Sequence, residues 1–349
     1  MKILNVMLGK QKGGLENVFS AYTRLFREIG YESVALCHKK SPYKNDLEKL
    51  GIPVYTMTAL KINPFTWFRL IWVIKQVQPD VLCLHGNRAV YFATSWILKL
   101  FIRPFPKTIA TAHNNRNKIF HRLDGVFAIS NILKDNLINH FYIPENKVFL
   151  CPNAVSLPQS VPPLKYEPHN PIQIGFFGRL HPVKGLDVLL DACQKLKENK
   201  VDFKLLVAGD GALLSELQEQ VQNLLLKDNV DFLGWIDDKK SFFDKIDILC
   251  IPSRSEGQPL TLLEGLSYAK PLIVSSCPGM LEVVNQTKCA LSFPIEDSNR
   301  LFECLLELIQ NPQKCDEFSQ NAYQLFLKKY TEEAQKKNLV YGIEKICQN

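Results

Sequence analysis

Residues 246–269 read IDILCIPSRSEGQPLTLLEGLSYA, a transition from a strand to a helix that organises the second half of the chain. Residues 246–251 are almost entirely apolar, as in a parallel strand covered on both faces. Residues 252–258 form a loop, and Pro259 suits the first position of a helix, which is expected to bury Leu260, Leu263 and Leu266. The free N–H groups and positive dipole end at the start of such a helix favour an anion. The stretch therefore predicts an anion site where the strand ends.

A second such transition carries two cations. Residues 171–177 are an apolar run that ends in Gly178-Arg179, and residues 187–196 have helical periodicity. Arg179 and Lys184 then lie on the loop at the carboxyl end of a strand, where open α/β sheets bind ligands. Two cations at this place suit a diphosphate. Taken alone, the pair fits two solvated surface cations equally well.

Two glutamates complete the pattern. Glu256 lies in the loop before the helix, and Glu264 lies about a turn and a half into it, so both carboxylates can face one cleft. A carboxylate accepts hydrogen bonds from two neighbouring hydroxyls, which suits the diols of a sugar or a ribose. By itself, Glu264 fits a surface residue near a helix start as well.

The segments Gly178-Arg179-Leu180…Lys184-Gly185 and 256–264 (EGQPLTLLE) together resemble the donor site of glycosyltransferase family 4, which has the GT-B fold. The resemblance implies that Arg179 and Lys184 hold the donor diphosphate and that Glu264 binds the ribose. It also implies that the donor sugar meets Glu256 and the backbone of Gly257, Gln258, Pro259 and Leu260. Many family members have an aromatic residue where this chain has Gln258, so the donor sugar is left open.

The chain begins with a strand at residues 2–8, a loop at 9–14 and a helix at 15–29. Gly13 and Gly14 allow backbone to approach a ligand at the helix start, although the pattern is neither a dinucleotide fingerprint nor a phosphate loop. Gly13-Gly14-Leu-Glu16 resembles the family's glycine pair at the interdomain cleft. A further glycine turn, at Gly211, resembles the loop near the nucleotide.

Two histidines follow predicted strands, His85 in LHGN and His113 in TAHN. Each could be a structural histidine, or could donate to a sugar hydroxyl in a cleft. The resemblance favours His113 as a donor-sugar and catalytic contact, together with Glu256, Arg179 and Lys184. It assigns binding of the acceptor to His85, Glu16, Asn114 and Arg116.

Strand-like and helix-like runs alternate along both halves of the chain, which predicts parallel sheets covered by helices. The expected fold is α/β, with two Rossmann-like, doubly wound parallel-sheet domains facing each other across a cleft. An acceptor-binding domain spans 1–160 and a nucleotide-sugar-binding domain 170–330, joined by a proline-rich linker. The resemblance implies that the helix at 331–349 packs back on the first domain.

The 349 residues, 46% of them hydrophobic, suffice for two domains. No apolar run approaches the ~18 residues of a membrane span, and residues 1–8 are too short for a secretory leader. The ten cysteines form no Cys-x-x-Cys pair, so a reducing cytoplasm is expected. Residues 1–165 carry 22 Lys+Arg against 9 Asp+Glu, and residues 166–349 carry 20 against 26. The basic half fits an anionic partner, such as a membrane surface or a phosphorylated glycan, or simple solvation of the domain, and no motif supports nucleic acid.

Two helical segments, 64–78 and 88–101, are rich in aromatic residues and flanked by cations. The rings could belong to the core, or could dock with the cations on the anionic inner face of the cell membrane. The composition alone fits both interpretations.

The resemblance implies a retaining transfer from a UDP- or GDP-linked sugar to an acceptor hydroxyl. The basic charge of the first half favours a glycan or lipid-linked saccharide as the acceptor, as in lipopolysaccharide or other surface polysaccharide biosynthesis. No Asp-x-Asp motif ends a predicted strand, so no metal and no cofactor are expected, and Arg179 and Lys184 would stabilise the leaving diphosphate. A sugar nucleotide epimerase of the same fold and a non-catalytic, membrane-attached sugar-nucleotide-binding subunit are the alternatives.

Overall fold

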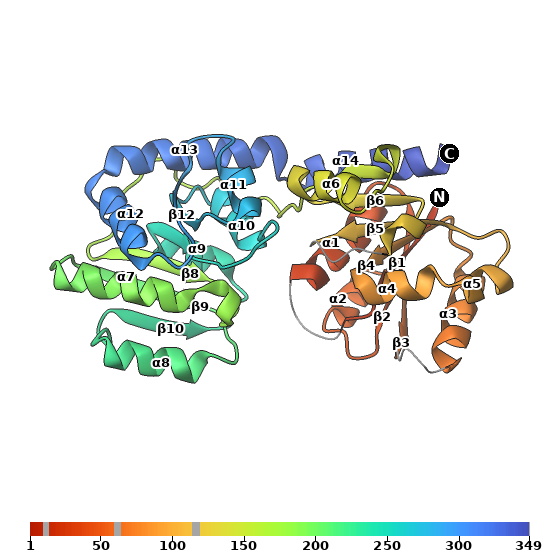
Figure 1. Ribbon diagram of the computed structural model, residues 1–349, viewed down its shortest axis with the longest axis horizontal. Coiled ribbons are helices and arrows are strands. Elements are labelled where there is room, and N and C mark those ends of the chain that lie inside the picture. Colours follow the sequence, from red (N-terminus) through yellow and green to blue (C-terminus); the bar gives the residue numbers. More distant parts are fainter. Residues whose placement is uncertain (10–13, 59–63, 114–118, 349) are drawn as a thin grey trace. The chain divides into compact units, whose positions relative to one another are not determined.

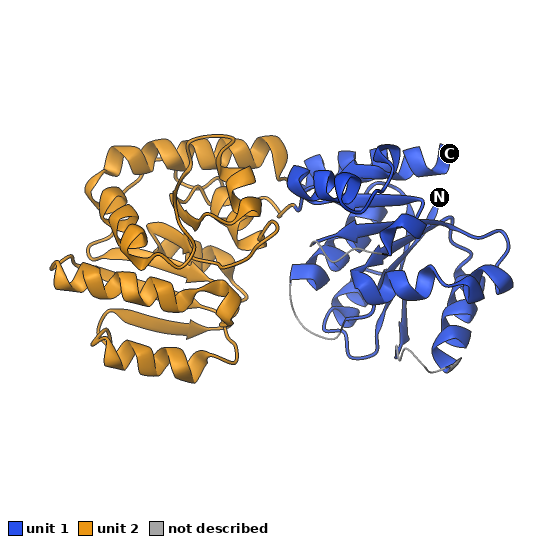
Figure 2. Cartoon of the chain, in the orientation of Figure 1, with its two compact units in different colours: residues 1–153, 332–349 blue, residues 154–331 orange. Residues whose placement is uncertain are grey.

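The computed structural model describes residues 1–9, 14–58, 64–113 and 119–348 (Figure 1). The chain divides into two compact units (Figure 2). The first comprises Met1–Asn153 and Glu332–Asn349, and the second comprises Ala154–Thr331. Each unit has its own parallel sheet and its own core, so the predicted α/β fold with two doubly wound sheets is confirmed.

The first unit is built on a seven-stranded sheet in the order β3-β2-β1-β4-β5-β6-β7. All its strand pairs are parallel. The strands are β1 (Lys2–Met7), β2 (Glu32–His38), β3 (Val54–Met57), β4 (Val81–His85), β5 (Lys107–Ala112), β6 (Gly125–Ala128) and β7 (Val148–Leu150). The strand order reverses between β1 and β4, and such switch points are where open α/β sheets bind ligands.

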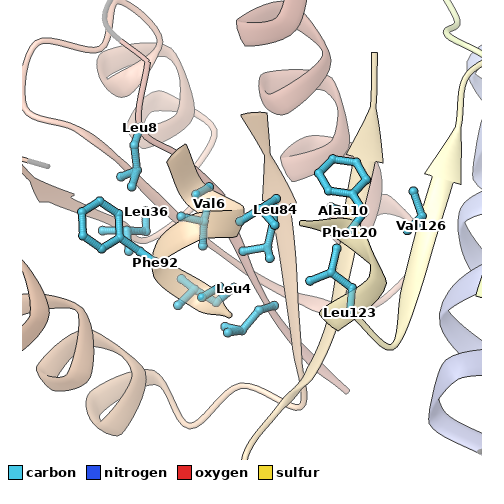
Figure 3. Close-up of a cluster of buried hydrophobic side chains, with 14 of the residues drawn as sticks. Leu4, Val6, Leu8, Leu36, Leu84, Phe92, Ala110, Phe120, Leu123 and Val126 are labelled. Atoms are coloured by element: carbon cyan, nitrogen blue, oxygen red, sulfur yellow. The ribbon is translucent and has the colours of Figure 1, made fainter. Parts of the chain in front are cut away.

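Helices cover both faces of this sheet: α1 (Gly14–Glu28), α2 (Lys44–Lys49), α3 (Pro64–Val77), α4 (Gly86–Ala93), α5 (Trp96–Phe101), α6 (Asn131–Asn139) and α14 (Glu332–Gln348). Side chains of β1 and β4, including Val6 and Leu84, pack with Phe92 of α4 in one buried cluster (Figure 3). On the other face, Leu339, Ile343 and Ile346 of α14 share a cluster with β-strand residues. The last helix of the chain therefore completes the core of the first unit.

The second unit has a six-stranded parallel sheet in the order β10-β9-β8-β11-β12-β13. Its strands are β8 (Ile172–Phe177), β9 (Phe203–Ala208), β10 (Val230–Gly234), β11 (Ile248–Ile251), β12 (Leu272–Ser275) and β13 (Ala290–Phe293). Its helices are α7 (Leu186–Glu198), α8 (Leu214–Asn223), α9 (Lys239–Lys245), α10 (Leu260–Ser267), α11 (Pro278–Val284), α12 (Ser298–Gln310) and α13 (Pro312–Lys329). Here the switch point lies between β8 and β11, the two strands that precede the predicted donor loops.

The structure corrects two expectations about the helices. The expectation of one helix over 88–101 is wrong, because α4 and α5 are separated at Ser95, whose hydroxyl accepts a hydrogen bond from Ile97 N at 3.3 Å and caps α5. Pro259 caps α10 with extended backbone (ψ 135°) instead of opening it, and Leu260 is half-buried. Across the described ranges, no helix combines the length and hydropathy that a bilayer crossing requires.

Candidate active site

Two loops leave the carboxyl ends of the neighbouring strands β8 and β11, and they touch each other. Residues 178–185 connect β8 to α7, and residues 252–259 connect β11 to α10. Arg254 N donates to Val183 O at 2.7 Å, which ties one loop backbone to the other. The fold thus joins the two sequence segments that carry the candidate donor-site residues.

Lys184 and Glu256 meet where these loops touch. Lys184 Nζ lies 2.5 Å from Glu256 Oε1, and the Ser253 hydroxyl donates to the same oxygen at 3.2 Å. The side chains of Lys184 and Glu256 are only 26% and 14% exposed, respectively. Arg179 lies on the same loop as Lys184 and is exposed. The arrangement places Lys184 and Glu256 together on the loops that lead into α7 and α10, with Arg179 on the same loop as Lys184.

Arg254 fastens the two loops together. Its guanidinium binds Asp187 at the start of α7 in a bidentate manner, with Nη1–Oδ1 at 2.9 Å and Nη2–Oδ2 at 2.6 Å. Its Nε also donates to Glu296 at 2.6 Å. Hydrogen bonds to Asp187 and Glu296 raise the pKa of Arg254, so the group stays charged. Sequence reasoning missed Arg254, although its position two residues before Glu256 was a usable signal.

Close backbone packing also shapes this site. Gly185 has φ +67°, and a Cβ there would lie 2.0 Å from Pro252 O, in the neighbouring loop. A Cβ on Gly211 would lie 2.2 Å from Leu180 O, so the loop after β9 packs on the loop after β8. Gly185 and Gly211 therefore fit the site because they have no side chain.

Glu264 pairs with a lysine that lies outside both of these loops. Its carboxylate is 7% exposed, and Lys239 Nζ from the start of α9 donates to its Oε1. Burial raises the pKa of Glu264, and the charge of Lys239 opposes that shift. Nothing in the sequence spacing pointed to Lys239. Of the remaining donor candidates, Gln258 is buried and Gly257 is exposed.

In the first unit, His85 and His113 lie at the carboxyl ends of the neighbouring strands β4 and β5, with ring centroids 6.4 Å apart. His85 is 1% exposed, and its ring packs edge-on against Tyr22 at 5.2 Å. Burial lowers the pKa of His85 well below its ordinary value and that of His113 to about 4. Both rings are therefore neutral at pH 7.

Glu16 and Gly14 lie near the same edge of this sheet. Gly14 begins α1, and the carboxylate of Glu16 approaches Gly9, where a Cβ would lie 2.6 Å from Glu16 Oε1. The remaining candidates, Gly13, Asn114 and Arg116, lie outside the described residues. Their assignments stay predictions.

Several solved structures share this architecture. The match to a glycosyltransferase from Rickettsia africae has a TM-score of 0.86 at 20% identity and covers 100% of this chain and 99% of that chain. The match to Anabaena Alr3699/HepE in complex with UDP-glucose has a TM-score of 0.83 at 18% identity and covers 99% of each chain. These likenesses define the fold as GT-B.

Sequence comparisons define the family. Residues 12–159 match the model of Glycosyltransferase Family 4, and residues 165–325 match that of Glycosyl transferases group 1. The two matches together place the chain in glycosyltransferase family 4, whose group 1 model covers most of the second unit. A Haemophilus influenzae protein named uncharacterized glycosyltransferase is 27% identical, with 96% of this chain and 94% of the relative covered. The O-antigen biosynthesis glycosyltransferase WclY of Escherichia coli is 32% identical over 40% of this chain and 37% of the relative.

Proposed function

We propose that this glycosyltransferase moves a sugar from a nucleotide diphosphate sugar to a hydroxyl of a glycan or lipid-linked saccharide, with retention and without a metal. The observation that carries this proposal is the contact of Lys184 with Glu256 beside the start of α10, on loops that leave the switch point of the second sheet. Lys184 already pairs with one anion, the carboxylate of Glu256. A diphosphate bound at the same place would also be stabilised by the dipole of α10.

The charge of each residue indicates its role in the proposed reaction. Arg179, Lys184 and the first N–H groups of α10 stabilise the charge that develops on the leaving diphosphate. Binding of the diphosphate gives Lys184 a second anionic partner, which frees Glu256 to accept hydrogen bonds from the donor sugar. Glu264 accepts from the ribose, and its charge is kept in place by Lys239. The departing phosphate takes the proton of the acceptor hydroxyl.

The first unit supplies a histidine for the donor sugar and also the acceptor side of the reaction. His113 is neutral at pH 7, so its ring can donate one hydrogen bond without adding a charge beside the sugar. His85, expected as an acceptor contact, is buried beside the His113 ring, and we assign it a positioning role instead. The similarity to an O-antigen glycosyltransferase supports a surface polysaccharide or lipopolysaccharide acceptor. The complex of Anabaena HepE with UDP-glucose makes UDP-sugars the first donors to test, with GDP-sugars second.

Arg179→Ala and Lys184→Ala test the proposal. After a thermal-shift screen identifies a stabilising nucleotide sugar, each variant should lower turnover by about 10²-fold, since each removes a charge that acts on the leaving group. Lys227→Ala, an exposed lysine of the same unit, is the matched control and should keep its rate. Normal rates in both site variants would overturn the phosphate assignment.

A second measurement addresses the two alternative functions. The protein is incubated with the stabilising nucleotide sugar and no acceptor, and the products are separated by chromatography. An epimerised sugar nucleotide would identify an epimerase. In a parallel incubation with acceptor present, binding of the nucleotide sugar without any turnover would identify a non-catalytic subunit.

A further inference from the structure

Helices α3, α4 and α5 of the first unit expose an unusual number of large apolar side chains. Phe65 and Phe68 of α3 are 76% and 66% exposed, and Trp96 of α5 is 73% exposed. We call the full set the aromatic face: Phe65, Phe68, Trp72, Tyr91, Trp96, Leu100 and Phe101. The helices α3 and α5, which carry all of these residues except Tyr91, contact each other and lie side by side (Figure 1).

The aromatic face is not the outer edge of the core. On α3, Leu70, Val73 and Ile74 are buried, whereas Phe68 and Trp72 point outward from the same helix. A surface helix normally carries polar residues on its outer side. Trp67 and Phe92 do belong to the interior, with ring centroids 4.7 Å apart. The two interpretations of these aromatic segments therefore apply to different rings.

Cations accompany the aromatic face. The guanidinium of Arg69 lies over the Trp72 ring, 4.4 Å from its centroid. Lys99 is exposed on α5 between Trp96 and Leu100, and its Nζ lies 5.8 Å from the centroid of Phe105. The same short helix thus carries both the apolar and the charged side chains.

Lys99 also lines a pocket of about 340 Å³ with three more cations, Arg103, Lys107 and Arg122. One carboxylate, Asp124, lines it too, but it accepts hydrogen bonds from Thr108 N and Oγ1, both at 2.8 Å. The pocket is open, is large enough for a glycerophosphate group, and has a clear excess of positive charge. Lys107 begins β5, so the pocket lies at the opposite end of that strand from His113.

We propose that the aromatic face docks on an anionic lipid bilayer and that the pocket of Lys99, Arg103, Lys107 and Arg122 takes the phosphate of a lipid headgroup. Tryptophan and phenylalanine favour the boundary between headgroups and acyl chains. Lysine and arginine near an anionic leaflet add attraction, worth roughly fivefold in partitioning per cation. This docking goes beyond sugar transfer, because it requires neither donor nor acceptor.

The test is flotation of the purified full chain with vesicles that contain no saccharide acceptor. Vesicles of equal parts phosphatidylglycerol and phosphatidylcholine should carry the protein, and pure phosphatidylcholine vesicles should not. The triple variant Phe68→Ser/Trp72→Ser/Trp96→Ser should lose at least about tenfold in partitioning. The triple variant Lys99→Gln/Arg103→Gln/Lys107→Gln should lose about as much or more and should show a weaker salt dependence.

Matched control variants come from the second unit. Leu225→Ser/Leu327→Ser removes exposed apolar side chains there, and Lys227→Gln/Lys245→Gln/Lys328→Gln removes three exposed charges. Both controls should float like the wild type, and circular dichroism should show all variants folded. Equal losses in the control variants would overturn the proposal by showing non-specific attraction.

Two further outcomes would also overturn it. Absence of vesicle binding combined with titratable binding of inorganic phosphate would show a site for a free anion. Absence of vesicle binding combined with self-association that the aromatic variant abolishes would show that the aromatic face is an interface between copies of this chain. Each result is obtained without a sugar donor, so it is independent of the proposed transfer.

Discussion

Lys239 of α9 forms an ion pair with Glu264 of α10, and the two partners differ in exposure. The Glu264 side chain is 7% exposed, whereas that of Lys239 is 43% exposed. Burial raises the pKa of Glu264 above its ordinary 4.5, and Lys239 limits the rise. The proposed ribose ligand is thus paired with a lysine from another helix, whose charge favours the ionised carboxylate.

Lys239→Met should lower the free energy of unfolding at pH 7 by about 1–3 kcal/mol, because it leaves a buried carboxylate unpaired. Because the pKa of Glu264 is raised in the folded state, its protonated form stabilises the fold. This stabilisation is complete below pH 4.5 and is lost as the pH rises through the raised pKa. Without Lys239 this pKa rises further, so the stability lost through Lys239→Met is larger at pH 7 than at pH 4.5. Urea unfolding at both pH values checks the prediction, with Lys240→Met, whose partner Asp244 is exposed, as the control. An equal loss at both pH values would contradict it.

Arg254→Lys keeps a positive charge but cannot make the bidentate contact with Asp187. We expect a free energy of unfolding about 1–2 kcal/mol lower and a several-fold higher KM for the donor, with a smaller change in kcat, because the loop of Glu256 is held less firmly. Arg300→Lys alters a surface pair with Glu303 and should change neither quantity. A fall in kcat alone would indicate that Arg254 contacts the reacting groups directly.

Gly185→Ala should cost more stability than Gly234→Ala, although both glycines have left-handed backbone, at φ +67° and +69°. Each substitution strains the backbone by about 1–2 kcal/mol. At Gly185 the new Cβ would also lie 2.0 Å from Pro252 O. A Cβ on Gly234 would have no such neighbour within 4 Å. The additional loss, at least about 1 kcal/mol, is measured by denaturant unfolding. Equal losses would mean that the loop after β11 moves freely.

His85 makes the stability of the first unit depend on pH. Burial lowers its folded-state pKa well below the ordinary 6.5, so only the unfolded chain takes up its proton as the pH falls. Stability is full above about pH 6.5 and falls below it by up to about 1.4 kcal/mol per pH unit. His85→Phe should remove this part of the slope between pH 6.5 and 5, whereas the exposed His140→Phe should not. Denaturant unfolding across this range is the measurement.

Much of the fold could be predicted from the sequence, because buried parallel strands are continuous apolar runs. The runs at 172–177 and 246–251 became β8 and β11, and Gly-rich or charged loops follow both. The approach of residues 178–185 to 252–259 also followed, since both loops leave the same edge of one sheet. The single helix over 88–101 failed because aromatic periodicity continues across Ser95, where the backbone turns.

Local patterns in the sequence determined the class of fold, the family and the loops that carry the candidate site. The tertiary structure alone decided which charges meet, that His85 is buried, and which aromatic rings face outward. Lys239 reaches Glu264, and Arg254 reaches Asp187, from elements far apart in the chain. The physical reason is that periodicity is a property of neighbouring residues, whereas a contact between distant ones depends on strand order and on how each helix is rotated against its sheet.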